Sequence, residues 1–283
     1  RGNLLSICSG GATAIQYISN TGKVLRLLLN SGSQVSGEEM GRMIGCTRAA
    51  VGKVIETLRQ QGFVIEARTR TGYQLISEPQ EMIPARVEAR LPEGGLGIPH
   101  IHFREIDSTN LEARRRAEQG LPHGACLSTD YQTAGRGRFN RPWVTPEAAG
   151  LLFSLFLRPS MHLSDVFSLT SLMAVAICLA VENLGGPGAA IKWPNDIMVE
   201  SRKIAGILIE NSLKGSDILA TVIGIGVNVN QIHFAGDLQA AVSLEMMDGK
   251  KRDIETEINK LTGAFLTSYE NFLALGAEKT YWS

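Results

Sequence analysis

The chain has 283 residues, 44% of them hydrophobic and 20% charged, and its acidic and basic side chains balance to no formal net charge. This composition is that of an ordinary globular protein, so it excludes a polycation and a largely disordered chain, and the length favours two domains. The charge is uneven, however: residues 1–80 carry nine Lys/Arg and five Asp/Glu, a net charge of +4, and the remainder carries −4. The basic N-terminal part indicates an anionic partner there.

The cysteines and the apolar stretches give no sign of secretion or membrane insertion. No two cysteines have the spacing of a metal or redox motif, which predicts reduced thiols in a cytoplasmic protein: Cys8, Cys46, Cys126 and Cys178. The longest apolar stretch, residues 169–181, is too short to span a bilayer, so no membrane association is expected. Residues 1–22 are interpreted as a disordered or non-native leader.

Three short helices are predicted after this leader. Residues 23–32 form an apolar run that ends in glycine, and a second helix begins after Ser36, which fits a capping box with the glutamate three residues later. Gly45 ends that helix, and Thr47 caps the next one, in which apolar residues recur at helical spacing over residues 47–61. Two helices separated by a tight glycine-containing turn are typical of a helix-turn-helix motif.

A hairpin follows these helices. Residues 63–76 contain two strand-like runs around a basic turn, so residues 23–78 are expected to form a winged helix-turn-helix domain. In such a domain the last helix enters the major groove with its first turn, and the wing contacts phosphates. The candidate DNA-binding residues are Thr47, Arg48, Lys53, Arg68 and Arg70. The alternative is a three-helix module whose charges are merely solvated.

Residues 79–99 are predicted to be a linker between two domains. Residues 77–99 contain four of the ten prolines and lack a strong period, apart from a small helix expected around residues 81–89. The second domain is therefore expected to cover residues 100–283.

The second domain is predicted to combine strands and helices around a mixed sheet, which gives the α+β fold class. Strand-like runs occupy residues 100–110, 125–132, 150–159, 189–200, 203–211 and 220–230. Residues 165–186 form a long, nearly all-apolar helix, which is expected to be buried. Gly224 and Gly226 mark a place where another group approaches the last strand closely. A final amphipathic helix is marked by Ile258, Leu261, Phe265, Tyr269 and Phe272.

Two histidines on the first of these strands are spaced as metal ligands can be. His100 and His102 would lie on the same strand face, and such a pair can bind a metal ion. Because the sequence suggests no third ligand nearby, a surface strand is favoured and no metal site is predicted.

The stretch YQTAGRGRFNRPW, residues 131–143, concentrates positive charge on a glycine-rich loop. Its arginines Arg136, Arg138 and Arg141 suit a triphosphate or pyrophosphate, although the spacing is neither that of a P-loop nor that of a dinucleotide-binding loop. Such a self-repelling loop is expected to be disordered until an anion binds. A solvated basic loop is the alternative.

Other polar groups strengthen the case for an anion site. KWPND, residues 192–196, places a lysine, an aromatic ring, an amide and a carboxylate at a turn between strands. Lys203 opens an otherwise apolar strand, which is a costly position without a fixed anionic partner. The small polar residues 108–110 lie at a helix N-terminus, where they suit a polar ligand edge or a carboxylate.

Together these motifs resemble those of a known family. DSTN, QTAGRGR, KWPNDI, RKIAGILIE and GIGVNVN occur in the order and approximate spacing of biotin–protein ligases. With the winged helix in front, the chain is similar to the bifunctional enzymes that also repress the biotin operon. The resemblance covers about residues 23–283 and implies a winged helix-turn-helix followed by a mixed-sheet catalytic domain of the biotin/lipoate ligase type.

The resemblance also implies an activity. Biotin and ATP, with Mg²⁺, would give biotinyl-5'-AMP, and the biotinyl group would pass to a lysine of the biotin carboxyl carrier protein, a subunit of acetyl-CoA carboxylase. The adenylate would promote binding to operator DNA by a ligand-linked homodimer in the cytoplasm. Two other functions stay open: a lipoate–protein ligase, and a ligand-sensing transcription factor without ligase activity.

The resemblance assigns roles to particular residues. Biotin contacts are implied for Ser108, Thr109, Asn110, Gln132, Gly135, Arg136, Arg138, Lys203 and Gly206. Nucleotide contacts are implied for Arg138, Arg141, Trp143, Lys192, Asn195 and Asn228. The catalytic residues would be Lys203 and Arg138, which stabilise developing charge, and Asp196, which acts as base or orienter for the acceptor amine.

Two features depart from the family pattern. The family loop often has the order R-R-G-R, whereas this chain has Arg138-Phe139-Asn140-Arg141 and so lacks one cation, although Asn tolerates a left-handed backbone. The repressor-type family normally continues into a small C-terminal β-barrel, which we expect to be absent from the sequence that ends at residue 283.

Overall fold

A computed structural model describes residues 19–258, apart from residues 69–70, 80, 92–95, 160–165, 216, 235–239 and 255. The expected leader therefore lies outside the described residues up to residue 18, and the predicted last helix does so beyond Ile258. Residues 20–22 of that leader instead form the first turn of helix α1, because the Ser19 side chain accepts a hydrogen bond from the Gly22 amide and caps the helix there. Within the described part of the chain, no helix is long and apolar enough to cross a lipid bilayer.

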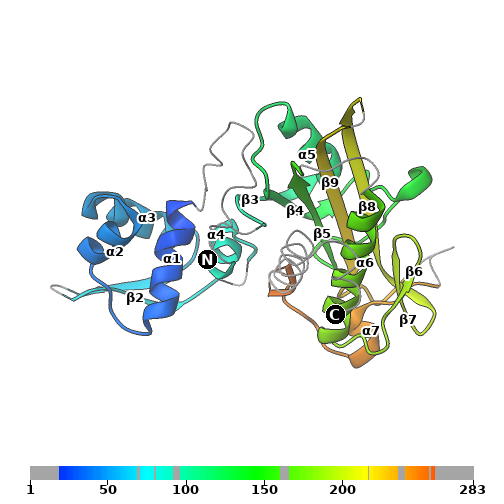
Figure 1. The fold of residues 1–283 in the computed structure, drawn as a ribbon. Helices are drawn as coiled ribbons and strands as arrows, with labels where there is room; N and C mark the ends of the chain where they lie inside the picture. The colour runs from blue at the N-terminus through cyan, green and yellow to red at the C-terminus, as the bar shows by residue number, and fades with distance from the viewer. Residues whose placement is uncertain are drawn as a thin grey trace, which may run out of the picture.

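The N-terminal unit has the predicted winged helix-turn-helix architecture (Figure 1). Its elements are α1 (Asn20–Ser31), α2 (Gly37–Ile44), α3 (Arg48–Gln60), β1 (Val64–Arg68) and β2 (Gly72–Ser77). The predicted caps are confirmed, since Ser36 accepts from the Glu39 amide and Thr47 accepts from the Ala50 amide. Buried side chains at helical spacing join the three helices into a small core: Val24, Leu25, Met40, Val51, Ile55 and Leu58.

A glycine makes the turn between α2 and α3 possible. The Gly41 carbonyl accepts a hydrogen bond from the Cys46 amide, and a Cβ added at Gly41 would lie only 2.6 Å from the Cys46 carbonyl oxygen. Gly45 then takes the left-handed backbone that ends α2. The angle between the two helices therefore depends on the missing side chain at residue 41.

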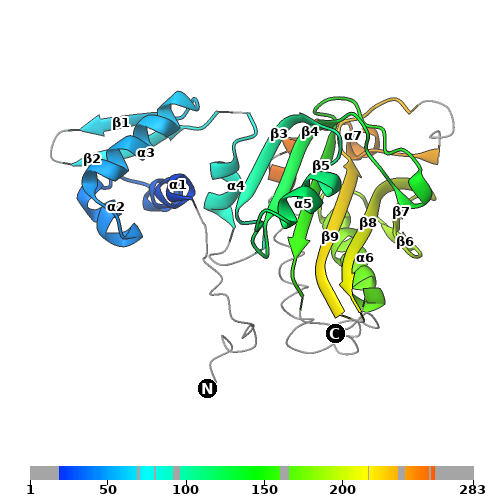
Figure 2. The ribbon, with the colours of Figure 1, turned by 90° about the horizontal axis from the view of Figure 1, so that it is seen from above.

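The predicted linker contains a buried helix rather than a free connection. Helix α4 (Pro84–Arg90) confirms the small helix expected there, and it lies between the N-terminal unit and the sheet in both views (Figures 1 and 2). Ala85 and Ala89 pack into the core of the N-terminal unit, whereas Val87 packs into the core of the larger unit. Its burial between two cores could not be predicted, because a helix of seven residues with apolar side chains on two faces has no clear period.

The larger unit contains a mixed seven-stranded sheet, as predicted. The strands are β3 (His100–Ile106), β4 (Cys126–Gln132), β5 (Gly150–Leu157), β6 (Ala190–Lys192), β7 (Asp196–Val199), β8 (Arg202–Lys214) and β9 (Asp217–Asn228), and their order is β3-β4-β5-β9-β8-β7-β6. Among these described strands, β3 and β4 pair in parallel and the other neighbours are antiparallel. The remaining elements are α5 (Thr109–Ala117), the short 3-10 helix η1 (Arg138–Asn140), α6 (Val166–Asn183) and α7 (Leu244–Asp248).

The two faces of the sheet have different covers (Figure 2). On β5, Phe153 and Leu155 point to the face that packs with the apolar side chains of α6. The alternate residue Phe156 packs with Ala113 of α5, and Ser154 contacts the start of that same helix. The α5 face therefore combines apolar packing with polar groups, and it carries the candidate site.

Candidate functional site

Bare backbone forms the floor of the candidate site. Gly206 on β8 and Gly226 on β9 are register partners in the sheet. The indole of Trp143 lies over both, because an added Cβ would come within 2.9 Å of it at Gly206 and within 2.5 Å at Gly226. The Trp143 Nε1 atom is buried and has no hydrogen-bond partner among the described residues. An aromatic ring over side-chain-free strands, with one spare donor, suits a flat ligand that slides between them.

A lysine and a carboxylate border this floor. Lys203 Nζ lies 2.7 Å from Asp196 Oδ1, and it also lies 5.4 Å from the centre of the Trp143 ring as a cation–π contact. At this distance the ammonium and the carboxylate form a close ion pair, and Asp196 Oδ1 is buried. The fixed anionic partner predicted for Lys203 is thus Asp196, which an incoming anion has to replace.

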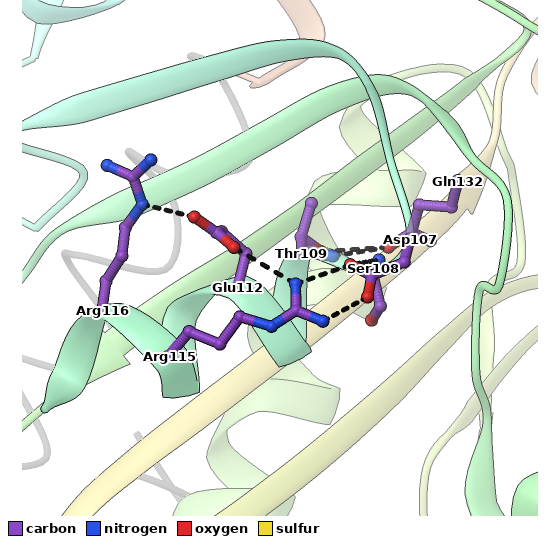
Figure 3. A network of polar contacts seen from close by, with 7 residues as sticks. All are labelled: Asp107, Ser108, Thr109, Glu112, Arg115, Arg116 and Gln132. Atoms are coloured by element: carbon purple, nitrogen blue, oxygen red, sulfur yellow. Dashed lines mark hydrogen bonds and ion pairs between the residues drawn. The ribbon is translucent and has the colours of Figure 1, made fainter.

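The turn before α5 is joined to the end of β4. Gln132 Oε1 accepts hydrogen bonds from the Thr109 amide, at 2.9 Å, and from the Thr109 hydroxyl, at 3.2 Å (Figure 3). Ser108 and Thr109 are both buried, and Ser108 occupies the N-cap position without capping the helix through its side chain. The structure thus brings together three of the predicted ligand-contacting side chains at one edge of the sheet.

Asn110 has a different place from its neighbours. Its Oδ1 accepts from the Ser154 hydroxyl at 2.6 Å, and its Nδ2 donates to Glu210 Oε2 at 2.8 Å. A Cβ at Gly224 would lie 2.3 Å from Asn110 Oδ1, which confirms the close approach predicted for that glycine. Asn110 therefore fastens α5 to the sheet, a role that its position in a run of small polar residues did not reveal.

The arginine loop is folded as a small hairpin. The Trp143 amide donates to the Gly135 carbonyl and the Gly137 amide donates to the Arg141 carbonyl, at 2.9 and 2.7 Å. At its tip, Phe139 and Asn140 both have positive φ, 55° and 59°, so Asn140 does adopt the left-handed backbone that was expected of it. The expectation that this loop orders only when an anion binds stays a prediction for solution measurements.

The exposed arginines of this hairpin face the KWPND turn at one point. Arg138 Nη1 donates to Asn195 Oδ1 at 3.3 Å, and Asn195 Nδ2 donates to the Ile207 carbonyl. Asn195 thereby links the loop to β8. Arg136 and Arg141 are exposed, with side chains available to a ligand's phosphates.

Two of the residues predicted to contact the nucleotide, Lys192 and Asn228, do not take part in the contact between the arginine loop and the KWPND turn. Asn228 is buried, and its amide donates to the carbonyls of Lys203 and Val242, so it holds β8 and β9 to the segment before α7. Lys192 is exposed on β6, the strand at the edge of the sheet. Asn228 thus holds the backbone of β8 at Lys203, whereas Lys192 lies at the outer edge of the sheet.

Sequence reasoning missed an ion-pair network on α5. Arg115 contacts both carboxylate oxygens of Asp107 and also Glu112, which in turn binds Arg116 (Figure 3). Hydrogen bonds from Arg115 hold the pKa of the Asp107 carboxyl below its usual range, and those from Arg116 and Arg115 do the same for the pKa of Glu112. The spacing of Glu112 and Arg116 is a visible signal, but an Asp107–Arg115 contact across eight residues is not.

Four of the five candidate DNA-contacting residues lie within the described part of the N-terminal unit. Arg48 and Lys53 are exposed on α3, behind the N-cap Thr47, and Arg68 is exposed at the end of β1, where it pairs with Glu66. Arg48 and Arg68 line one hollow between the wing and the start of α2. Arg70 falls outside the described residues.

The architecture and these residues define a class of protein. A winged helix-turn-helix precedes a mixed sheet on which a lysine, arginines and an aromatic ring border bare glycine backbone. Cations and flat apolar walls together suit a nucleotide, so the chain combines a DNA-binding module with a nucleotide-dependent enzymatic domain.

Comparisons with known proteins identify the family. Residues 103–228 match the model of the biotin/lipoate A/B protein ligase family, and residues 21–74 match that of an HTH domain. The "Bifunctional ligase/repressor BirA" of Bacillus spizizenii is 36% identical over 257 residues, which cover 89% of this chain and 79% of that protein. The protein of the same name from Escherichia coli is 35% identical over 73% of this chain and 63% of its own length.

Solved structures agree with this result. The biotin protein ligase from Aquifex aeolicus in complex with biotin and ATP superposes with a TM-score of 0.56 at 28% identity, and the match covers 64% of this chain and 74% of that one. The chain belongs to the family of biotin–protein ligases, in its bifunctional ligase/repressor branch.

Proposed function

We propose that this protein activates biotin with ATP to biotinyl-5'-AMP, transfers the biotinyl group to a lysine of a biotin carboxyl carrier protein, and represses biotin-synthesis genes by binding operator DNA. One observation carries the enzymatic part: Lys203 lies against both Asp196 and Trp143 at the edge of the Gly206–Gly226 floor. A cation, an aromatic wall and bare backbone are what an acid joined to a nucleotide requires at a single place.

The first step forms the mixed anhydride. A biotin carboxylate oxygen bonds to the α-phosphorus of ATP, and the bond from that phosphorus to the β-phosphate bridging oxygen breaks, so that pyrophosphate leaves. Negative charge builds on the phosphoryl oxygens, where Lys203 Nζ and the Arg138 guanidinium stabilise it. Lys203 has to exchange its contact with Asp196 for a contact with the ligand, which frees the carboxylate for the second step.

The ureido ring of biotin is expected at the turn joined to β4. Ser108, Thr109 and Gln132 offer hydroxyl and amide groups to a neutral polar ring, and the backbone of Gly135, Arg136 and Gly206 completes that edge. Trp143 would then pack on the adenine, with Arg141, Lys192 and Asn195 toward the phosphates and ribose. Asn110 and Asn228 support these groups from beneath, because their amides are engaged within the protein.

The second step transfers the acyl group. A neutral lysine amine of the carrier attacks the anhydride carbonyl, and AMP leaves with the carbonyl–oxygen bond electrons. Asp196, released from Lys203, accepts or orients the proton of that amine. The arginine hairpin covers the anhydride and keeps water from it. Mg²⁺ is expected to arrive with ATP, where it would neutralise charge on the phosphates.

Operator binding belongs to the N-terminal unit. The first turn of α3 would enter the major groove with Thr47, Arg48 and Lys53, while Arg68 and Arg70 of the wing contact phosphates. We place the protein in the cytoplasm, as a homodimer whose formation depends on the adenylate. The domain limits are part of this proposal: a DNA-binding domain that begins with α1 at Asn20 rather than at residue 23 and ends at residue 78, and a catalytic domain over residues 100–283, with residues 79–99 as a connection built around α4.

Mass spectrometry of a carrier domain tests the proposal. After incubation with this protein, biotin and MgATP, the domain is expected to gain one biotinyl group on a lysine, and pyrophosphate exchange is expected with biotin but not with lipoate. Exchange driven by lipoate alone would assign the enzyme to the other branch of the ligase family. A carrier that stays unmodified while biotin still changes operator binding would support a sensor without ligase activity.

A further inference from the structure

An arginine outside the ligand face holds the turn that carries Ser108 and Thr109. Arg115 lies on the exposed side of α5 and reaches back eight residues to Asp107, the first residue of that turn. Its Nη1 donates to Asp107 Oδ1 at 3.1 Å, and its Nη2 contacts Oδ2, so the contact has two parallel bonds (Figure 3). A forked contact of this kind fixes orientation as well as distance.

Asp107 lies at the junction of the turn and the arginine loop. Its Oδ1 also accepts from the Ser108 amide at 2.7 Å, which bends the backbone toward the start of α5. Its main-chain carbonyl accepts from the Ala134 amide at 2.9 Å, immediately before Gly135. A shift of Asp107 therefore moves both the Thr109–Gln132 edge and the base of the loop.

The guanidinium of Arg115 is itself held from a second side. Its Nη1 lies 3.3 Å from Glu112 Oε2, and the other oxygen of Glu112 accepts from Arg116 Nε at 2.7 Å. The side chain thus lies between two carboxylates, that of Asp107 before the helix and that of Glu112 in its first turn (Figure 3). Ser108 does not cap α5 through its side chain, so the Asp107–Arg115 contact adds a side-chain tie between the turn and the helix to the main-chain bond from the Glu112 amide to the Ser108 carbonyl.

We propose that Arg115 is a positioning residue for biotin, which acts through Asp107 to set the Ser108–Thr109 edge without touching the ligand. This inference rests on the proposed function. It predicts a larger effect on biotin recognition than on ATP binding, since the Asp107 side chain holds the Ser108 amide directly, whereas Asp107 reaches the arginine loop only through its main-chain carbonyl. The contact is half exposed, so added salt weakens it.

The test measures pyrophosphate exchange with purified full-length variants. Arg115→Ala is expected to raise KM for biotin about fivefold, with kcat and KM for ATP changed less than about twofold. Arg115→Lys, which keeps the charge but loses the fork, should recover part of the difference. Arg116→Ala is the matched control, because Arg116 binds Glu112 but not Asp107, and its KM for biotin should equal that of the wild type.

Two further measurements separate positioning from a general loss of structure. Asp107→Asn should raise KM for biotin as Arg115→Ala does, and the double variant should be no worse than either, since both break one contact. Salt should raise KM in the wild type but not in Arg115→Ala. An unchanged KM for biotin in Arg115→Ala, or parallel losses of kcat, ATP affinity and melting temperature, would overturn the inference. Absence of exchange in the wild type would instead contradict the proposed function.

Discussion

Lys203 illustrates how one residue is prepared for a later partner. A lysine beside a carboxylate and an aromatic face already has both kinds of interaction that a bound acyl-adenylate can replace. The Lys203 side chain is about one-third exposed, so the ion pair with Asp196 is weak enough to be exchanged. Lys203 Nζ therefore pairs with Asp196 in the ligand-free protein and is proposed to stabilise phosphoryl charge in the transition state, so its removal tests the second role.

Lys203→Ala is expected to slow adenylate formation by about 10²–10³-fold, because the transition state loses a preorganised cation. Biotin should still bind, since the side chains proposed to hold its ring, Ser108, Thr109 and Gln132, lie on the turn before α5 and on β4. Single-turnover formation of biotinyl-AMP and equilibrium biotin binding measure the two effects. Lys214→Ala, at the exposed far end of the same strand, is the control. Near-normal adenylate formation in Lys203→Ala would mean that Lys203 pairs with Asp196 but does not stabilise the transition state.

His100 gives a second prediction at this scale, on pH. Burial, assisted by the neighbouring His102, lowers the pKa of His100 to about 3, while its Nε2 lies 2.7 Å from Ser128 Oγ and Glu88 holds its main-chain amide. Between pH 6.5 and 3 the unfolded chain binds a proton at this residue that the folded protein does not. The free energy of unfolding should therefore fall as pH falls through this window, by up to about 1.4 kcal/mol per pH unit. Above pH 6.5 neither state is protonated at His100, and this pH dependence disappears.

His100→Gln removes that titration while it keeps a polar group near Ser128. Urea unfolding between pH 4.5 and 6.5 should show a smaller slope of free energy against pH for the variant than for the wild type. The range stays above about 4, where carboxyls such as Asp107 with a lowered pKa begin to lose their contribution. Equal slopes would mean that His100 is protonated in the folded protein.

At the scale of elements, sequence patterns predicted most of the fold. Helices with caps and glycine stops, such as α2 and α3, began and ended within a residue or two of expectation, because capping chemistry is local. The strands of the sheet were also found, since their apolar runs are long. The pattern could not show that the Asn110 side chain, at the start of α5, binds Glu210 of β8, or that Asn228 of β9 binds the Lys203 carbonyl of β8. Both contacts depend on which strands become neighbours.

The helix-turn-helix offers a test with a built-in control. Gly41→Ala should disrupt the turn, because its Cβ would lie 2.6 Å from the Cys46 carbonyl oxygen, and it should abolish operator binding while ligase activity remains. Gly52→Ala, inside α3 with no heavy atom within 4 Å of the added Cβ, should stabilise the protein by up to about 1 kcal/mol. Electrophoretic mobility shifts and thermal unfolding measure both. Normal operator binding by Gly41→Ala would contradict this account of the turn.

At the scale of the whole molecule, α4 joins two cores that the sequence assigned to separate domains. The buried Glu88 on this helix accepts from the Ser19 amide and hydroxyl with one oxygen, and from the His100 amide with the other. Arg26 of α1 donates to the carbonyls of Glu88, Ala89 and Leu91 at the end of α4. Removal of residues 1–80 would therefore uncover the apolar face of α4, which the interpretation as a simple linker did not foresee.

Glu88→Gln should weaken this connection. One of the two oxygens becomes an amide that cannot accept from a main-chain N–H, so a buried donor loses its partner at a cost of about 1–3 kcal/mol. Urea unfolding monitored by circular dichroism should show a lower midpoint for the variant than for the wild type, and the two units should unfold in separate steps. Glu118→Gln, at an exposed position, should leave the curve unchanged. A single transition at the wild-type midpoint would argue against a tie through Glu88.

The packing of Trp143 on the two glycines has a practical consequence for kinetics. An indole that leaves its contact with strand backbone and gains a nucleotide base changes its emission, so the reaction can be followed in real time without a label. Trp193 is 74% exposed, and the sequence has one further tryptophan, Trp282, so phenylalanine at both positions leaves Trp143 as the one emitting indole. Stopped-flow fluorescence then resolves ligand entry from anhydride formation and acyl transfer in a single experiment.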